Sequence, residues 1–222
     1  MAHISGAVRG LRRLEGFSDA VFAIALTLLF VEIKPPGASD GPAVGASLWD
    51  AIAAQWREHL ALALSFFAIG VYWLQHHYTG RIYARSDHGF SAINLGFLLA
   101  VMFVPYPVRI WAFHVGTPHE ASSSLVLTLG LMVPALFWMG KWIYGRPRPI
   151  MDDRLAPDFV RQMGRRYSIA ALLAVAAVPL ALAAPRAGVA LTLSILLYFL
   201  MPQPRPRYRP GMEPDEKEAS AE

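Results

Sequence analysis

The feature that most constrains the fold of this chain is a series of long apolar blocks that contain almost no charge. They cover residues 20–31, 60–74, 92–108, 125–144 and 167–200. A helix needs about 20 mostly apolar residues to cross roughly 30 Å of hydrocarbon. Several blocks reach that length, and only 16% of the chain is charged, against roughly 25% in soluble domains. The sequence therefore predicts an all-α integral membrane protein.

Proline, glycine and charged residues divide these blocks into helices. The final run, residues 167–201, would extend about 50 Å as one helix, too far for a single crossing. Pro185 and Arg186 near its middle divide it into two helices joined by a tight hairpin. The other helices are expected at about 14–33, 48–78, 88–108 and 122–144. We therefore expect six transmembrane helices in one domain, residues 1–201, and a disordered cytoplasmic tail, residues 202–222, which is rich in Pro, Arg and Glu.

The basic residues predict the orientation of the helices. With six spans, sixteen of the 20 Lys and Arg residues fall on the side that holds both termini. Lys141 and the six arginines between residues 146 and 166 form the largest group there. The opposite side has Lys34, Arg57, Arg109 and Arg186. Because cytoplasmic loops are enriched in Lys and Arg, both termini are expected to be cytoplasmic.

The first apolar run follows three arginines, as in a signal peptide. However, the acidic residues Glu15 and Asp19 lie between the arginines and the apolar run, and no small-residue cleavage site follows. We interpret it as a retained helix that ends before Pro35 and Pro36. Its uninterrupted apolar part, residues 20–31, is shorter than a full span. The charged first turns must therefore be shielded by protein, which places this helix inside the bundle.

Polar side chains gather at the same predicted depth near the cytoplasmic ends of the first three helices. The first helix contributes Arg13, Ser18 and Asp19. Charge inside a span is costly and marks either function or an internal partner. The plainer alternative is that these groups only lock the helices together. The candidate partners from the next two helices are Trp73, Gln75, His76, His77, Asp87, His88 and Asn94.

Further along the first helix, Ile24, Thr27, Leu28 and Val31 are spaced i, i+3, i+4 and i+7, so they share one helical face. Periodicity alone favours ordinary packing for such a stripe. A second reading comes from the run Arg13-x-x-x-Phe17-Ser18-Asp19, its apolar continuation, and the Glu-Ile-Lys-Pro-Pro that ends at Pro36. Together with Trp73, His76-His77, Asn94 and Pro105-Tyr-Pro107, this run resembles the transmembrane protein 175 family of endolysosomal potassium channels and their bacterial relatives.

The resemblance covers about residues 9–110, while the later helices match mainly in number and length. It implies a homotetrameric potassium channel in a bacterial plasma membrane, with a pore formed by four copies of the first helix. Ile24 is then the expected constriction, and Thr27, Leu28 and Val31 line the pore beyond it. The motif residues, which hold the first helix in place, are Arg13, Phe17, Ser18, Asp19, Trp73, His76, His77 and Asn94.

Such a pore would select ions differently from ordinary potassium channels, because the chain has no Thr-Val-Gly-Tyr-Gly filter whose carbonyls replace the ion's hydration shell. An apolar ring can gate by dewetting or admit a partly hydrated ion. Potassium sheds water more readily than sodium, so modest selectivity for potassium is expected. The Thr27 hydroxyl could supply some replacement oxygens.

Other functions find less support in the residues. There is no cysteine, phosphate loop, nucleophile elbow or His-Glu-x-x-His motif. We therefore expect no enzyme activity, no cofactor or metal beyond permeant K⁺, and no nucleic-acid or other small-molecule partner. A proton-coupled or other secondary transporter, in which Asp19 and the histidines relay protons, remains the main alternative, followed by a purely structural membrane protein.

Overall fold

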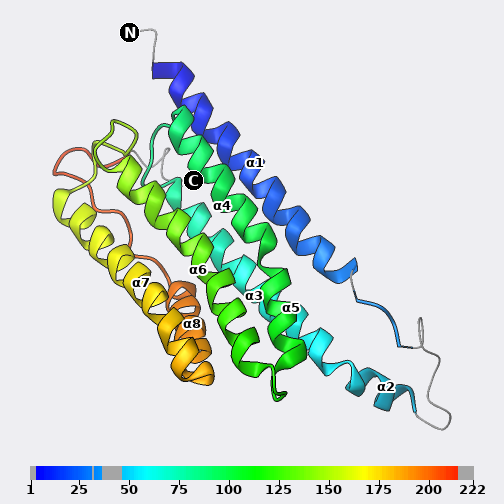
Figure 1. Ribbon diagram of the computed structural model, residues 1–222. Helices are drawn as coiled ribbons and strands as arrows, with labels where there is room; N and C mark the ends of the chain where they lie inside the picture. The colour runs from blue at the N-terminus through cyan, green and yellow to red at the C-terminus, as the bar shows by residue number, and fades with distance from the viewer. Residues whose placement is uncertain (1–3, 32, 37–46, 215–222) are drawn as a thin grey trace.

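The structure is a computed structural model that describes residues 4–31, 33–36 and 47–214. These residues form a bundle of helices (Figure 1). The β pairing among them is limited to isolated bridges between connecting segments. The helices are α1 (Ile4–Val31), α2 (Leu48–Ala54), α3 (Trp56–Thr79), α4 (His88–Phe103), α5 (Pro105–His114), α6 (Glu120–Gly145), α7 (Pro157–Ala183) and α8 (Pro185–Leu200).

Five helical stretches of the described residues are long and apolar enough to cross a membrane. The sixth predicted span, α8, has 16 residues and so a length of about 24 Å, somewhat less than the hydrocarbon thickness. The split of the last apolar run at Pro185 is confirmed, because Ala184 separates α7 from α8. The five long stretches are Leu11–Val31, Trp56–Thr79, His88–His114, Glu120–Gly145 and Pro157–Ala183.

The helix bounds differ from the sequence-based ones mainly at four places. The α1 helix begins at Ile4, well before its predicted start at about residue 14. Gln55 separates the short α2 from α3 within the predicted helix 48–78. The predicted helix 88–108 is divided at Val104, because Pro105 has no N–H to continue the ladder, and α5 then runs on to His114. The α7 helix begins at Pro157, well before the apolar run at residue 167.

Two glycines, Gly130 and Gly188, permit close approach between neighbouring helices. A Cβ atom on Gly130 of α6 would lie 2.3 Å from Cγ of Pro107 in α5. One on Gly188 of α8 would lie 2.5 Å from Cα of Ala181 in α7. Small residues let helices approach closely where hydrophobic burial does not drive association between them in lipid. The α5–α6 and α7–α8 contacts thus depend on these glycines.

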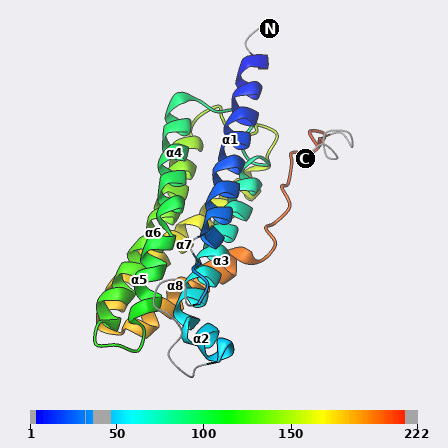
Figure 2. The ribbon, with the colours of Figure 1, turned by 90° about the vertical axis from the view of Figure 1, so that its right-hand side faces the viewer.

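The helices are arranged around α6, which packs against α4, α5, α7 and α8. The α1 helix lies at one edge of the bundle and not inside it as the sequence predicts. It contacts α3 and α4, and α7 and α8 lie on the opposite side (Figures 1 and 2). The main apolar core is formed by buried side chains of α1, α3, α4, α5, α6 and α8. Only one face of α1 takes part in it.

At the end of the bundle near the N-terminus, three connecting segments pack together. Tyr83 pairs with Met151, and Leu155 pairs with Tyr208, as isolated antiparallel bridges. Burial raises the pKa of the Tyr83 phenol in this cluster. The Tyr78 hydroxyl donates a hydrogen bond of 2.6 Å to the carbonyl of Pro204. Residues 202–214, predicted as part of a disordered tail, are therefore held on the bundle, while residues 215–222 lie outside the described residues.

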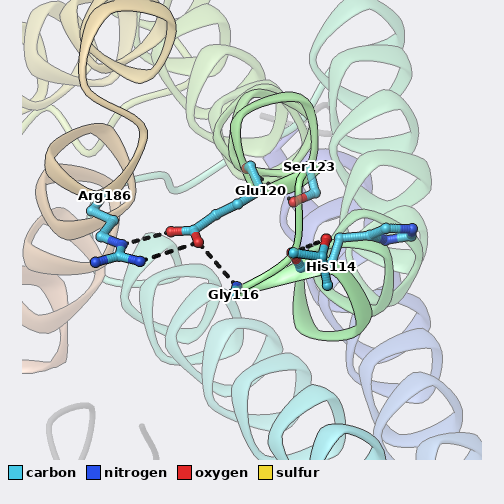
Figure 3. A network of polar contacts seen from close by, with 6 residues as sticks. His114, Gly116, Glu120, Ser123 and Arg186 are labelled. Carbon is cyan, nitrogen blue, oxygen red and sulfur yellow. Dashed lines mark hydrogen bonds and ion pairs between the residues drawn. The ribbon is translucent and has the colours of Figure 1, made fainter.

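At the opposite end of the bundle, an ion pair connects Glu120 at the start of α6 to Arg186 at the start of α8 (Figure 3). The Arg186 side chain donates to Glu120 with Nε to Oε1 at 2.7 Å and Nη2 to Oε2 at 3.3 Å. The backbone N–H of Gly116 also donates to this carboxylate, at 3.0 Å, and the φ of Gly116 is +75°, a conformation that glycine adopts at low cost. These contacts join the α5–α6 turn to the start of α8.

Candidate functional site

The candidate site is built on α1, whose two faces have different environments. The inner face buries Ser18, Phe22 and Leu29, which are 0%, 1% and 7% exposed. Their spacing of four and seven residues keeps them on one side of the helix. Phe22 packs against His76 of α3 and Phe97 of α4, with ring centroids 5.7 and 6.2 Å apart. This aromatic contact attaches α1 to the rest of the bundle.

The outer face of α1 holds all the residues predicted to line a pore. Ile24 and Leu28 are each 54% exposed, and Val31 is 77% exposed. Thr27 is exposed too, and its hydroxyl lies 2.9 Å from the carbonyl of Ala23 and 3.0 Å from that of Ile24. No described residue of the chain covers this stripe.

A buried polar chain crosses from α1 to α6 behind the inner face. The Ser18 hydroxyl donates to the Leu14 carbonyl at 2.7 Å and accepts from Asn94 Nδ2 at 2.9 Å. Lys141 Nζ donates to Asn94 Oδ1 at 3.0 Å. Both Ser18 and Asn94 are completely buried, and Lys141 is 1% exposed. This chain ties three helices together at one depth.

Lys141, counted among the basic residues of the cytoplasmic side, lies within the predicted helix 122–144, now α6, and its side chain is buried in the bundle. Its ammonium group lies 4.9 Å from the ring centroid of Phe97 and 4.8 Å from that of Trp138. Aromatic faces attract a cation, and Asn94 supplies an oxygen. The sequence contained the signal: a charge within the apolar run 125–144 calls for an internal partner.

The residues predicted as one network form two groups in the structure. Asp19 is exposed and accepts a 3.0 Å hydrogen bond from the indole Nε1 of Trp73, on which His77 stacks at 5.8 Å. Arg13 is also exposed, and Phe17 is 50% exposed. These side chains lie outside the buried Ser18–Asn94–Lys141 chain. On α1, Phe17 and Asp19 point about 100° to either side of Ser18, and Trp73 and His77 belong to α3.

His76 and Gln75 of α3 join neither group. His76 is 4% exposed and lies among the rings of Phe22 and Phe97, and its ring nitrogens have no hydrogen-bond partner among the described residues. Gln75 Nε2 donates to the carbonyl of Phe199 in α8, at 2.7 Å. Asp87 caps α4 by accepting from the Phe90 N–H at 2.8 Å. These three side chains therefore serve the packing and capping of the helices.

The described residues hold no group of three or more His, Cys, Asp or Glu side chains placed to bind a metal ion. Instead they define a multi-span helical membrane protein whose first helix is attached through one face only. The sequence profile of the family described as endosomal/lysosomal potassium channel TMEM175 matches residues 13–105, the part of the chain that contains α1, the Trp73 cluster and Asn94.

Individual relatives extend this match over most of the chain. A potassium channel of Streptomyces collinus is 35% identical over 78% of this chain and 86% of its own length. A potassium channel of Chamaesiphon minutus is 37% identical over 56% of this chain and 61% of its own length. The crystal structure of a lysosomal potassium-selective channel TMEM175 homolog from Chamaesiphon minutus superposes with a TM-score of 0.72 at 30% identity, covering 85% of this chain and 95% of that one. The chain belongs to the TMEM175 family, which consists of ion channels and not of enzymes.

Proposed function

We propose that this chain is the subunit of a potassium channel in a bacterial plasma membrane. Its relatives in Streptomyces collinus and Chamaesiphon minutus are potassium channels, which supports potassium as the permeant ion. In this proposal α1, α3, α4 with α5, α6, α7 and α8 are the six spans, and both termini are cytoplasmic. The packing of the α3–α4 turn, the α6–α7 segment and the residues after α8 at one end of the bundle supports that topology.

The uncovered outer face of α1 is the observation that carries the proposal. A single helix cannot enclose a pore, so the stripe must face lipid or other copies of itself. Homotetrameric assembly with α1 at the centre would place Ile24 and Leu28 of four chains around one axis. The position of α1 at the edge of the bundle leaves that face free for such contacts (Figure 2).

The pore proposed here would select ions by partial dehydration. The Ile24 side chain, 54% exposed, would form the constriction, and it would not replace the ion's water because it can neither donate nor accept hydrogen bonds. The Thr27 hydroxyl donates its single proton in a hydrogen bond to a backbone carbonyl of the helix. Its oxygen therefore remains an acceptor that can contact a cation, whereas Leu28 and Val31 keep the neighbouring surface apolar. Such a neck favours the larger, more weakly hydrated potassium ion over sodium to a modest degree.

The contacts behind α1 would hold the ring in place. Phe22 and the Ser18–Asn94–Lys141 chain attach α1 from within the subunit. Arg13 and Phe17 are exposed on α1, and Asp19 accepts a hydrogen bond from Trp73 of α3. We propose that these side chains set the angle of α1 at the cytoplasmic end of the pore.

Flux from liposomes tests this function. Purified protein is reconstituted in liposomes loaded with potassium or with sodium, and efflux is compared for wild type, Ile24→Asn and Leu182→Asn. Leu182 of α7 is 65% exposed, so the same substitution there controls for the polar side chain. We expect faster efflux of potassium than of sodium, altered by Ile24→Asn alone. Absence of flux from a folded tetramer would reject the channel, and flux that ignores Ile24 would move the constriction elsewhere.

A proton-coupled transporter is the second candidate, and the exposed Asp19 carboxylate beside Trp73 and His77 favours it. Coupled transport needs its partner ion, whereas a channel passes potassium down its gradient alone. Potassium efflux that stops when the proton gradient is collapsed, and stops in Asp19→Asn, would identify the transporter. Efflux that persists in both conditions supports the channel.

A further inference from the structure

Three exposed arginines near the junction of α6 and α7 have no partner among the described residues: Arg146, Arg161 and Arg165. Other arginines at this end do have partners. Arg148 donates to the Tyr144 carbonyl at 2.7 Å, and Arg154 contacts Asp152 at 3.0 Å. The three unpaired charges therefore remain available to a ligand.

A groove of about 390 Å³ opens between the two helices beside these arginines. Its inner part is apolar, with Ile143 61% exposed. Arg146 is the only charged residue among those that line it. The lining residues are Met139, Trp142, Ile143, Arg146, Pro147, Gly164 and Ser168.

Helical spacing places charge at the mouth of the groove and apolar surface deeper in it. Met139, Trp142, Ile143 and Arg146 have the spacing i, i+3, i+4 and i+7 on α6. On α7, the residues Arg161, Gly164, Arg165 and Ser168 repeat that spacing. The two helices run in opposite directions (Figure 1).

The contact between Gly164 of α7 and Trp142 of α6 shows which turns of the two helices lie at the same depth in the bundle. A Cβ atom on Gly164 would lie 3.2 Å from the indole nitrogen of Trp142. Arg146 and Arg161 therefore both lie about one turn closer to the end of the bundle than this contact, while Met139 and Ser168 lie one turn deeper.

We propose that this groove binds an anionic phospholipid from the leaflet at the arginine-rich end of the bundle. The phosphate would contact Arg146, Arg161 and Arg165, and an acyl chain would lie along Ile143 and Met139. Basic pockets between transmembrane helices are suited to anionic head groups. A lipid fits better than free phosphate, because most of the groove is apolar and belongs to two helices long enough to span a membrane.

The site is separate from the proposed pore and independent of ion conduction. The α7 helix lies on the side of the bundle opposite α1 (Figure 1). Four copies assembled around α1 would therefore leave the α6–α7 groove facing the bilayer.

Native mass spectrometry of the purified full-length protein in an uncharged detergent tests the site, with short-chain phosphatidylglycerol as the probe. The triple variant Arg146→Gln, Arg161→Gln, Arg165→Gln is compared with a control that loses three arginines elsewhere at the same end: Arg81→Gln, Arg205→Gln, Arg209→Gln. Since each basic side chain near an anionic surface contributes about 1 kcal/mol, the groove variant should bind on the order of 100-fold more weakly. The control should keep wild-type affinity.

A second variant, Ile143→Gln, separates a lipid from a free anion. It retains the arginines, so it should weaken phosphatidylglycerol binding without changing the binding of soluble glycerol phosphate. Equal losses in the two triple variants would overturn the proposal in favour of diffuse attraction to the basic end. Unchanged binding in the groove variant would overturn it too, as would competition by glycerol phosphate as strong as that of the lipid.

Discussion

The two faces of α1 are both apolar, yet they have opposite environments. Phe22 on the inner face is 1% exposed and contacts two aromatic rings, whereas Leu28 on the outer face is 54% exposed. Exposure of large apolar side chains would be a liability in water, but in a bilayer it costs little. Contacts with the other helices, and not hydrophobicity, therefore distinguish the face that stabilises the subunit from the face available for assembly and conduction.

The largest expected effect separates the two faces directly. Phe22→Ala should destabilise the subunit by about 3 kcal/mol, because it leaves a cavity between His76 and Phe97. Leu28→Ala should leave unfolding unchanged and alter ion flux. Unfolding in mixed micelles with increasing sodium dodecyl sulfate, together with liposome efflux, measures both properties. Equal destabilisation by the two substitutions would break the distinction between the faces.

The buried polar chain provides the next test of the inner face. Asn94→Leu removes the acceptor of the Lys141 ammonium group and should cost about 3 kcal/mol, because a buried charge loses its hydrogen-bond partner. Lys141→Met should cost less, about 1 kcal/mol, because it removes the buried charge but leaves the buried Asn94 Oδ1 without its donor. In the double variant most of the loss should be recovered. Additive losses in the same unfolding assay would show that the two residues are not coupled.

A smaller effect is expected for the exposed contact between Asp19 of α1 and Trp73 of α3. Trp73→Phe removes the indole N–H that donates to Asp19 but keeps an aromatic ring for His77. We expect a loss of about 1 kcal/mol or less in subunit stability. We also expect a change in single-channel conductance that exceeds the change in a control variant. Trp56→Phe, in the first turn of α3, is the matched control. A conductance that equals that of the control would assign Trp73 to packing alone.

The smallest effect is predicted far from both faces, at the ion pair of Figure 3. Glu120→Gln weakens the exposed contact with Arg186 while preserving its shape. Surface ion pairs contribute little to stability, so neither unfolding nor flux should change measurably. A clear loss of flux would mean that the junction of α6 and α8 influences the position of α1.

Much of the architecture could be predicted because it depends on composition along the chain. The apolar blocks identified the membrane helices, and the proline at residue 185 located the break between α7 and α8. The motif around Phe17 and Asp19 identified the family, which the relatives confirm. Helix ends were less predictable. The first turns of α7, from Pro157, are mostly polar, but their apolar side chains Phe159 and Met163 are buried in one cluster with Tyr83 and Trp142.

The sequence by itself determined that the chain is a helical membrane protein of this family, since span length and motif residues are local properties. Only the tertiary structure decided which side of α1 is buried, that Ser18 meets Asn94 while the adjacent Asp19 meets Trp73, and that Lys141 lies within the bundle. Neighbouring residues on a helix point about 100° apart. Which of them faces a partner depends on where the other helices pack, a property of the whole fold that no single segment encodes.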